Sequence, residues 1–495
     1  MMDSPPPRGG SNSLGSKAAR GAATMLLGQL SRVVVQMLSV VVLGRLLSPS
    51  DFGVLAMVTA VVGVGGLLRD FGLGQAAIQA KSISTAQKSN LFWLNSAVGL
   101  SVALIAFWCA PLISSVYRMG SLAPVVQALS IVFLLGGMAT QFRAELSRNM
   151  QFRRVIISEA SAQAVGVCLA VGLAVLGFGY WALVAQQLAD ATIVLILSAV
   201  LSRWWPHKPS RQPMSLFLRY GWGLLGTQVI LYISQNIDSF LIGRRYGATT
   251  LGEYNRAFQL LMLPLNQISA PATKVALPVL SRLRDEPIRF DDFLLRANLL
   301  VGGTVIVGLS FAASQSHALV LILLGPQWGS AADLFRLLAI AGCFQALSYA
   351  VFWVFLASGK TTSNLKFTLI TRSCVAILVI LGSQYSVEAV AVGYSLGLAL
   401  SWPSGLLWIR KWGPARRLAI QGFRLLVYGS YVAAASYATL LIPGISNPVV
   451  ELLLGGCGAI IALVIAFFLF RPMKVDTRSM VHTWNLLKGT GRAAN

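Results

Sequence analysis

The chain has 495 residues, of which 56% are hydrophobic and only 11% are charged, and its mean hydropathy is +0.71. Globular chains average about 45–50% apolar and roughly 25% charged residues, so this composition excludes a set of soluble domains. The net charge of +23 could suggest a nucleic-acid-binding protein, but the chain lacks the solvated polar body that would carry a basic patch. We therefore expect an integral protein that crosses a membrane several times.

The N-terminal segment 1–20 is rich in Pro, Gly and Ser. We expect it to be an uncleaved cytoplasmic tail, because the apolar run after it is longer than the roughly 7–15 residues of a signal-peptide core. A helix needs about 20 apolar residues to cross the hydrocarbon core of a bilayer. This length predicts an all-α fold with fourteen transmembrane helices, near 21–43, 51–68, 90–114, 122–141, 155–178, 181–201, 217–242, 253–279, 297–314, 329–358, 367–383, 387–409, 425–442 and 448–470.

The distribution of basic residues supports this number of helices. Thirty of the 39 Lys and Arg residues fall in the segments on one side of the predicted membrane, and only four fall in the loops on the other side. Because cytoplasmic loops carry an excess of Lys and Arg, both termini are predicted to be cytoplasmic. Most of these residues are expected to determine topology and to contact anionic lipids.

An internal repeat divides the helices into two lobes. A shift of 199 residues aligns LGRLLSPSDFG (43–53) with IGRRYGATTLG (242–252), and each segment joins two apolar helices. Internal repeats are typical of secondary transporters. The predicted organisation is a tail (1–20), a six-helix N-lobe (21–202), a cytoplasmic linker (203–216), a six-helix C-lobe (217–412), two further helices (413–470) and a basic tail (471–495).

Polar side chains form two matching stripes in the first helix of each lobe. Gln29, Arg32 and Gln36 follow i, i+3, i+7 spacing, which places them on one helix face. The repeat-related stripe contains Gln228, Tyr232, Gln235 and Asp238. These stripes are expected to line a substrate cavity, although side-chain amides also pack helices together in membranes.

The helix predicted at 253–279 carries two basic residues, Arg256 and Lys274. Gln267 follows Arg256 by 11 positions and precedes Lys274 by 7, so the three side chains are expected to share one face. Three prolines recur at seven-residue intervals in the same helix: Pro264, Pro271 and Pro278. Proline removes a backbone donor and kinks helices, so we expect this helix to be bent or divided.

Two carboxylates in the first lobe, Glu159 and Asp190, are candidates for carrying a coupling proton, because burial favours a protonated carboxyl group. The alternative is an ion pair with Arg32 or with a loop arginine. Arg336 and Arg372 lie within a few turns of the predicted helix ends and are expected to extend toward the interface. No Cys or His spacing indicates a metal site or a catalytic site. We expect no cofactor, and transport driven by a proton or sodium gradient or by the membrane potential.

The membrane cations indicate the chemistry of the cargo. Guanidinium groups pair with phosphate oxygens, and amides and hydroxyls match the donors and acceptors of a sugar. A sugar attached to a lipid diphosphate has both the phosphate oxygens and the sugar hydroxyls. The residues predicted to contact the phosphates of such a cargo are Arg32, Arg256 and Lys274.

The segments 43–58 (LGRLLSPSDFGVLAMV) and 235–283 carry a family resemblance. The second contains, in order, IGR, LG-x-Y-x-x-A, P-L-x-Q-I and P-x-L-S-R. The chain resembles the polysaccharide-export branch of the multidrug/oligosaccharidyl-lipid/polysaccharide flippase superfamily, in particular Wzx-type flippases of the colanic-acid-exporter kind. The resemblance implies a flippase in the bacterial cytoplasmic membrane that moves undecaprenyl-diphosphate-linked oligosaccharide units by alternating access for exopolysaccharide biosynthesis. Membrane lipids and a polysaccharide polymerase or export assembly would be its partners.

Three alternatives stay open at this point. A drug or cation antiporter of the multidrug branch should favour carboxylates over arginines in its cavity. A lipid II flippase should have an arginine cluster with an acidic partner near the start of the first helix, whereas here Val33 follows Arg32. A membrane glycosyltransferase or polymerase should have a large loop with paired carboxylates, and no predicted loop is long enough.

Overall fold

The computed structural model describes residues 33–70, 73–80, 82–211, 215–443 and 447–469, and these residues contain helices and no β-strand. Eleven of the described helices are long and apolar enough to cross a membrane, which confirms an all-α, multi-pass membrane protein. Large hydrophobic side chains on these helices are exposed in the isolated chain, for example Trp108 (76%) and Ile105 (62%). Such a surface is stable in contact with lipid rather than water.

The chain divides into two compact units, unit 1 (Met1–Ile233) and unit 2 (Ser234–Asn495), and each is described by itself. The boundary between them falls inside helix α8 (Ser215–Pro264), whereas the sequence places the boundary between lobes at 203–216. Of that predicted linker, residues 203–211 are described. His207 and Ser210 hydrogen-bond to Ser89, Asn90 and Trp93, so this described part of the linker is attached to unit 1.

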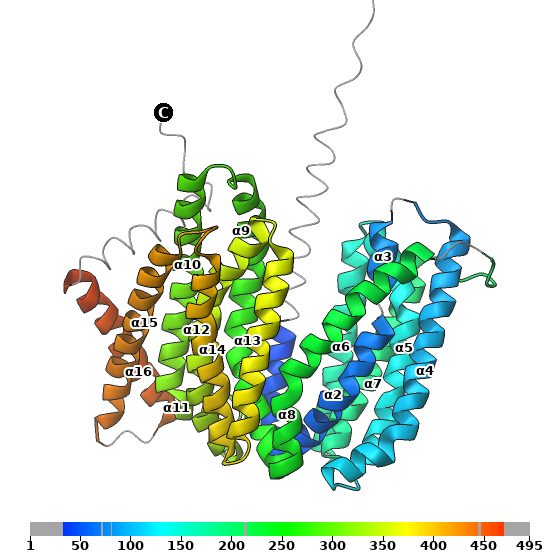
Figure 1. The fold of residues 1–495 in the computed structure, drawn as a ribbon. Helices are drawn as coiled ribbons and strands as arrows, with labels where there is room; N and C mark the ends of the chain where they lie inside the picture. The colour runs from blue at the N-terminus through cyan, green and yellow to red at the C-terminus, as the bar shows by residue number, and fades with distance from the viewer. Residues whose placement is uncertain (1–32, 71–72, 81, 212–214, 444–446, 470–495) are drawn as a thin grey trace, which may run out of the picture. The chain divides into compact units, whose positions relative to one another are not determined.

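Unit 1 is a bundle of neighbouring helices (Figure 1). It comprises Val33–Leu46, α2 (Pro49–Asp70), α3 (Leu73–Gln79), α4 (Thr85–Tyr117), α5 (Leu122–Arg148), α6 (Phe152–Val175), α7 (Tyr180–Ser202) and the first part of α8. The helix pairs α4–α5 and α6–α7 pack extensively, and α5 also packs on α7. Glycines let α4 and α5 approach closely, because the Cα atoms of Gly99 and Gly137 face each other across the helix contact.

Unit 2 begins with the rest of α8 and contains α9 (Ala270–Arg282), α10 (Pro287–Ser314), α11 (Ser316–Leu323), α12 (Gly329–Ala357), α13 (Thr361–Gly382), α14 (Val387–Ile409), α15 (Ala415–Ala438) and α16 (Pro448–Leu469). Among the described membrane-spanning helices α12 is the most buried, and it packs against α9, α10, α11 and α14. Trp353, Val354 and Phe355 are fully buried in its core cluster. A buried central helix gives the surrounding helices a common apolar contact surface.

Two backbone features interrupt the helices around α8. Gly247 has φ 86° and ψ −177° and separates α8 into two arms. This conformation is almost restricted to glycine, so the residue makes a very tight turn between the helices predicted at 217–242 and 253–279. After Pro264 the chain forms a π-helix, η1 (Leu265–Ser269), and then continues as α9. The predicted division of this proline-rich segment is therefore confirmed.

Candidate functional site

The residues predicted to bind cargo have different surroundings. Gln29 and Arg32 lie outside the described residues. The side chains of four others are exposed: Gln36, Gln228, Gln235 and Lys274. The remaining two, Asp238 and Arg256, are buried, with exposed fractions of 4% and 9%. A charge at a buried position must be balanced by the protein, so these two positions carry the strongest structural constraint.

Arg256 and Lys274 do not share a face, contrary to the expectation from their spacing. Arg256 lies in α8, is buried and donates a hydrogen bond to Gln259. Lys274 lies in α9 and is exposed. The π-helix η1 between them contains more residues per turn than an α-helix, so it turns α9 away from the orientation that an uninterrupted helix would have.

Asp238 forms a buried polar pair with Tyr254 within α8, across the turn at Gly247. The Tyr254 hydroxyl donates to Asp238 Oδ2 at 2.8 Å, and the Ser239 backbone N–H donates to Oδ1 at 2.7 Å. Tyr254 is only 1% exposed. The turn brings together two side chains that are 16 positions apart, and both oxygens of the carboxylate are hydrogen-bonded.

Tyr394 of α14 connects this pair to an arginine on α13. The ring of Tyr394 packs edge-on against Phe258, which is stacked on Tyr254. The Tyr394 hydroxyl interacts electrostatically with both Asp238 and Arg372. Tyr394 is thus close to both charged groups.

Arg372 also lines a pocket of about 270 Å³ between α12, α13 and α14. Among the described residues it is the only charged side chain in the lining. The other polar lining residues are Gln345, Ser348, Tyr349, Asn364, Thr368, Thr371 and Ser401. A guanidinium group surrounded by hydroxyls and amides can bind a phosphate group together with the hydroxyls of an adjoining sugar.

The sequence interpretation missed Arg372 as a site residue. It placed the helix at 367–383, which puts Arg372 close to the helix end, whereas α13 begins at Thr361 and Arg372 lies midway along it. Continuing the helix through the polar residues TTSNLK (361–366) would have shown this. A cation at mid-helix in a membrane-spanning segment indicates a functional site more strongly than one near an end.

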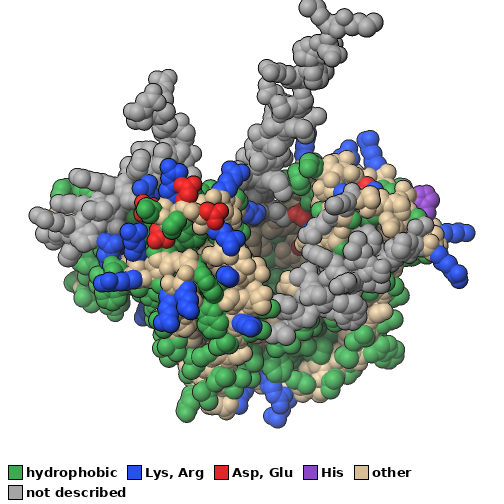
Figure 2. Space-filling view, turned by 45° about the horizontal axis from the view of Figure 1, so that its top comes forward, with side chains coloured by type: hydrophobic (Ala, Val, Ile, Leu, Met, Phe, Trp, Pro, Cys, Tyr) green, Lys and Arg blue, Asp and Glu red, His purple; other side chains and the backbone are tan. Residues whose placement is uncertain are grey.

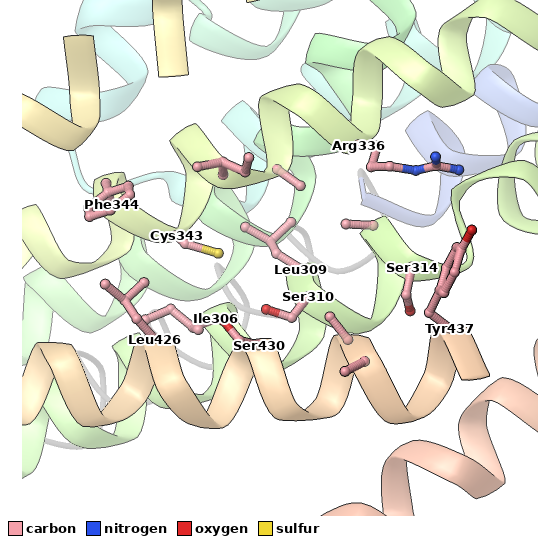
Figure 3. A pocket seen from close by; sticks show the side chains of 15 residues that line it. Ile306, Leu309, Ser310, Ser314, Arg336, Cys343, Phe344, Leu426, Ser430 and Tyr437 are labelled. Carbon is pink, nitrogen blue, oxygen red and sulfur yellow. The ribbon is translucent and has the colours of Figure 1, made fainter. Parts of the chain in front are cut away.

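A second cavity in unit 2 has a different character (Figure 3). It measures about 570 Å³ and lies between α10, α12 and α15, with Leu426, Ser430 and Tyr437 of α15 along one side. Apolar side chains make up most of its lining, and Arg336 is its only charged residue among those described. Because a sugar needs many hydrogen-bond partners, the Arg372 pocket is the better candidate for a polar cargo.

The two carboxylates considered for proton coupling differ in their partners. Glu159 of α6 is ion-paired with Arg143 of α5. Asp190 of α7 has a buried Oδ1 atom that accepts no hydrogen bond from the described residues. This oxygen packs against α6, because a Cβ added at Gly166 would lie 2.0 Å from it.

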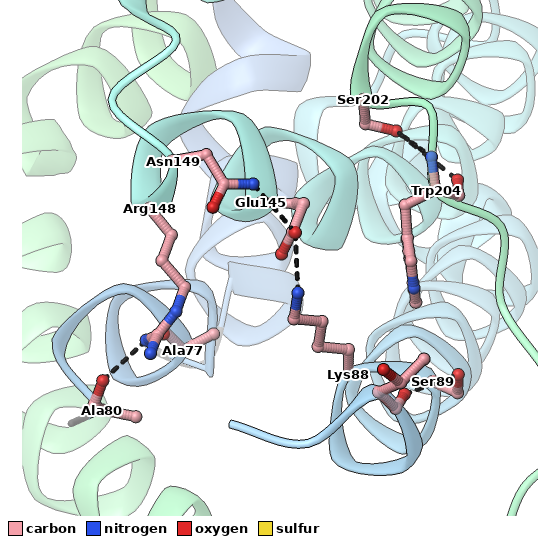
Figure 4. A network of polar contacts seen from close by, with 10 residues as sticks. Ala77, Ala80, Lys88, Ser89, Glu145, Arg148, Asn149, Ser202 and Trp204 are labelled. Atoms are coloured by element: carbon pink, nitrogen blue, oxygen red, sulfur yellow. Dashed lines mark hydrogen bonds and ion pairs between the residues drawn. The ribbon is translucent and has the colours of Figure 1, made fainter. Parts of the chain in front are cut away.

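Two basic residues that mark the predicted topology, Lys88 and Arg148, also hold unit 1 together (Figure 4). The Lys88 ammonium lies 2.7 Å from Glu145 Oε1, which also accepts a hydrogen bond from Asn149 at 3.0 Å. Arg148 donates to the carbonyl oxygens of Ala77 and Ala80 at the C-terminal end of α3. These contacts bind α3 and α4 to the end of α5, and cations are favourable at helix C-termini.

The fold defines the class of protein. The chain is similar to a solved structure of the lipid II flippase MurJ in an inward closed conformation, with a TM-score of 0.72 at 12% identity over 89% of this chain and 99% of that one. At this identity the likeness concerns the fold, which is that of a multi-helix membrane transporter. The chain belongs to the polysaccharide biosynthesis protein family, whose sequence model matches residues 42–333.

Two relatives agree with this assignment. The lipopolysaccharide biosynthesis protein WzxC of Escherichia coli is 24% identical over 398 residues, which are 78% of this chain and 79% of that protein. The teichuronic acid biosynthesis protein TuaB of Bacillus subtilis is 27% identical over 358 residues, or 69% of this chain and 71% of that protein. The resemblance to Wzx-type flippases, identified from segments 43–58 and 235–283, is confirmed.

Proposed function

We propose that this protein is a flippase that moves lipid-diphosphate-linked oligosaccharide units across the bacterial cytoplasmic membrane by alternating access, for exopolysaccharide biosynthesis. The observation that supports it most directly is the Arg372 pocket. It combines a cation midway along a membrane helix with a lining of hydroxyl and amide groups. Family membership and the transporter fold point in the same direction.

The pocket chemistry favours an anionic, sugar-bearing cargo over a cationic drug. A cationic drug would be repelled by Arg372, and no carboxylate lines this pocket among the described residues. A phosphate can accept two parallel hydrogen bonds from a guanidinium group. The volume of about 270 Å³ admits a phosphate and part of a sugar, so the rest of a repeat unit must extend beyond it.

The function can be tested with purified protein in liposomes. A lipid-diphosphate-linked oligosaccharide is placed in the inner leaflet, and a glycosidase that cannot cross the membrane is added outside. We expect the sugar to become cleavable at a rate that depends on the protein. Equal cleavage in protein-free liposomes would refute the proposal, whereas protein-dependent uptake of cationic dyes in its place would favour an antiporter.

We further propose Asp190 as the residue that couples transport to a proton gradient. Asp190 has a buried carboxylate oxygen with no hydrogen-bond partner among the described residues, so it can accept a proton without first breaking a hydrogen bond to one of them, unlike the paired Glu159. Asp190→Asn should therefore retain flipping but lose its stimulation by an imposed pH gradient, measured in the same liposomes. The control is Glu159→Gln, which should keep the stimulation. Stimulation of Asp190→Asn equal to that of the unchanged protein would contradict this role.

The membrane orientation is also proposed, with both termini in the cytoplasm. Three turns that the sequence assigns to the cytoplasm, α9–α10, α12–α13 and α14–α15, meet around one pocket at the same end of unit 2. Their meeting is expected if the helices between them alternate in direction as predicted. Protease accessibility of N-terminal and C-terminal tags in sealed inside-out vesicles tests the orientation, and protection of either tag would exclude it.

A polysaccharide polymerase or export assembly would receive the product.

A further inference from the structure

A third pocket lies where these three turns meet. It measures about 290 Å³ and is lined by residues of the α9–α10, α12–α13 and α14–α15 connections and of the start of α10. Three of the lining residues are basic: Arg284, Arg410 and Lys411. No ion pair between any of these three and a described acidic residue is present. The pocket is therefore a concentration of positive charge from separate parts of the chain.

The acidic side chain in the pocket does not balance this charge. Asp291 is the single carboxylate among the described lining residues. Arg417, which is outside the lining, lies 3.9 Å from Asp291 Oδ2 and 3.7 Å from Asp292 Oδ1, so Asp291 is already near another cation. Figure 2 shows Lys and Arg side chains gathered around a few acidic ones at this end of unit 2. An added anion would meet three cations and one shared carboxylate.

Part of the pocket lining is apolar and aromatic. Phe290 is buried, and Trp412 packs edge-on against Phe355 with ring centroids 6.1 Å apart. The Lys360 ammonium lies 5.5 Å from the centre of the Trp412 ring. Tryptophan next to basic residues is typical of the level of the bilayer where lipid phosphates lie. This combination favours a ligand that has phosphate groups and an apolar anchor.

We propose that this three-turn pocket binds the phosphate groups of an anionic phospholipid from the surrounding leaflet. The phosphates would lie among Arg284, Arg410 and Lys411, with the glycerol and the first part of the acyl chains beside Phe290 and Trp412. The site is separate from the Arg372 pocket, since the two share no lining residue. The proposal of a lipid-binding site does not depend on the proposed transport function.

The test is native mass spectrometry of the full-length protein with cardiolipin, phosphatidylglycerol or phosphatidylcholine. We expect the protein to retain cardiolipin and phosphatidylglycerol but not phosphatidylcholine. The variant Arg284→Gln/Arg410→Gln/Lys411→Gln should bind the anionic lipids about 100-fold more weakly, given the contribution of each basic residue near a charged lipid surface. All three side chains are exposed, so the variant should fold.

The matched control is Arg153→Gln/Lys208→Gln/Arg211→Gln. It removes the same charge from exposed residues of unit 1 that line none of the pockets described above. Its lipid binding should be unchanged, and Arg284→Lys/Arg410→Lys should keep most of the binding. An equal loss in both glutamine variants would show only general attraction to basic loops and overturn the site. Displacement of the lipid by inorganic pyrophosphate at equal concentration would overturn the requirement for a lipid anchor.

Discussion

Arg372→Ala is expected to reduce flipping by roughly 10- to 100-fold while the protein still inserts and folds. A hydrogen bond to a charged group contributes about 1.5–3 kcal/mol, which corresponds to this range if the guanidinium contacts the cargo phosphate. The measurement is glycosidase accessibility of the lipid-linked sugar in liposomes, with equal amounts of protein. Polymer output in a strain that carries only the variant gives a second reading.

Two variants separate the role of Arg372 from a general effect of lost charge. Arg372→Lys keeps the charge but lacks the planar pair of donors, so it should restore part of the activity. Arg336→Ala removes an arginine from the apolar cavity of the same unit and should leave transport near normal. Full activity of Arg372→Ala would exclude this pocket as the cargo site. A loss of transport in Arg336→Ala equal to that in Arg372→Ala would indicate that both arginines act by supporting the fold of unit 2.

Gly137→Ala is expected to destabilise unit 1 strongly. A Cβ at Gly137 would lie 2.5 Å from the Asn95 carbonyl oxygen and 3.2 Å from the Cα of Gly99. Both are backbone atoms, so α4 and α5 would have to move apart. Overpacking of this kind costs about 1–3 kcal/mol. Thermal unfolding of the purified protein in detergent should therefore begin at a clearly lower temperature.

The reciprocal change tests the same contact from α4. A Cβ at Gly99 would lie 2.6 Å from the Phe133 carbonyl oxygen, so Gly99→Ala should have a similar effect. The double variant Gly99→Ala/Gly137→Ala should lose less stability than the sum of the two single losses. Once the first methyl group has separated the helices, the second meets less steric resistance. Gly172→Ala is the control, since nothing lies within 4 Å of its added Cβ. An unchanged melting temperature in Gly137→Ala would mean that α4 and α5 are not closely packed in the membrane.

The positions of most helices could be predicted from the sequence because long apolar runs are required to cross a bilayer. The polar ends of the helices could not be predicted, since a helix can continue beyond the hydrocarbon core of the bilayer without a change in its backbone. Among helix starts, the four largest differences are helices that begin at Thr85, Pro287, Thr361 and Ala415 rather than near 90, 297, 367 and 425. The difference matters most for α13, because it moves Arg372 to the middle of the helix.

The candidate site was harder to predict, because it depends on which side chains meet. Spacing identified Asp238 as a membrane carboxylate but could not identify Tyr254 as its partner, since the tight turn at Gly247 brings the two together. The sequence also left two interpretations of Glu159 open, proton coupling and an ion pair with an arginine. The structure shows the ion pair with Arg143, a loop arginine in the predicted topology, whereas Asp190 Oδ1 accepts no hydrogen bond from the part of the chain that the structure describes.

The π-helix η1 also explains how the chain keeps its core side chains aligned. Leu261 and Leu280 are both fully buried, yet they are 19 positions apart, one more than the 18 residues of five α-helical turns. The π-helical turn takes up this one residue, so the two leucines face the same side. Loss of one residue within Leu265–Ser269 would leave a regular α-helix with α9 in its present orientation. The same deletion a few positions later would turn the rest of α9 by about 100° and move Leu280 out of the core.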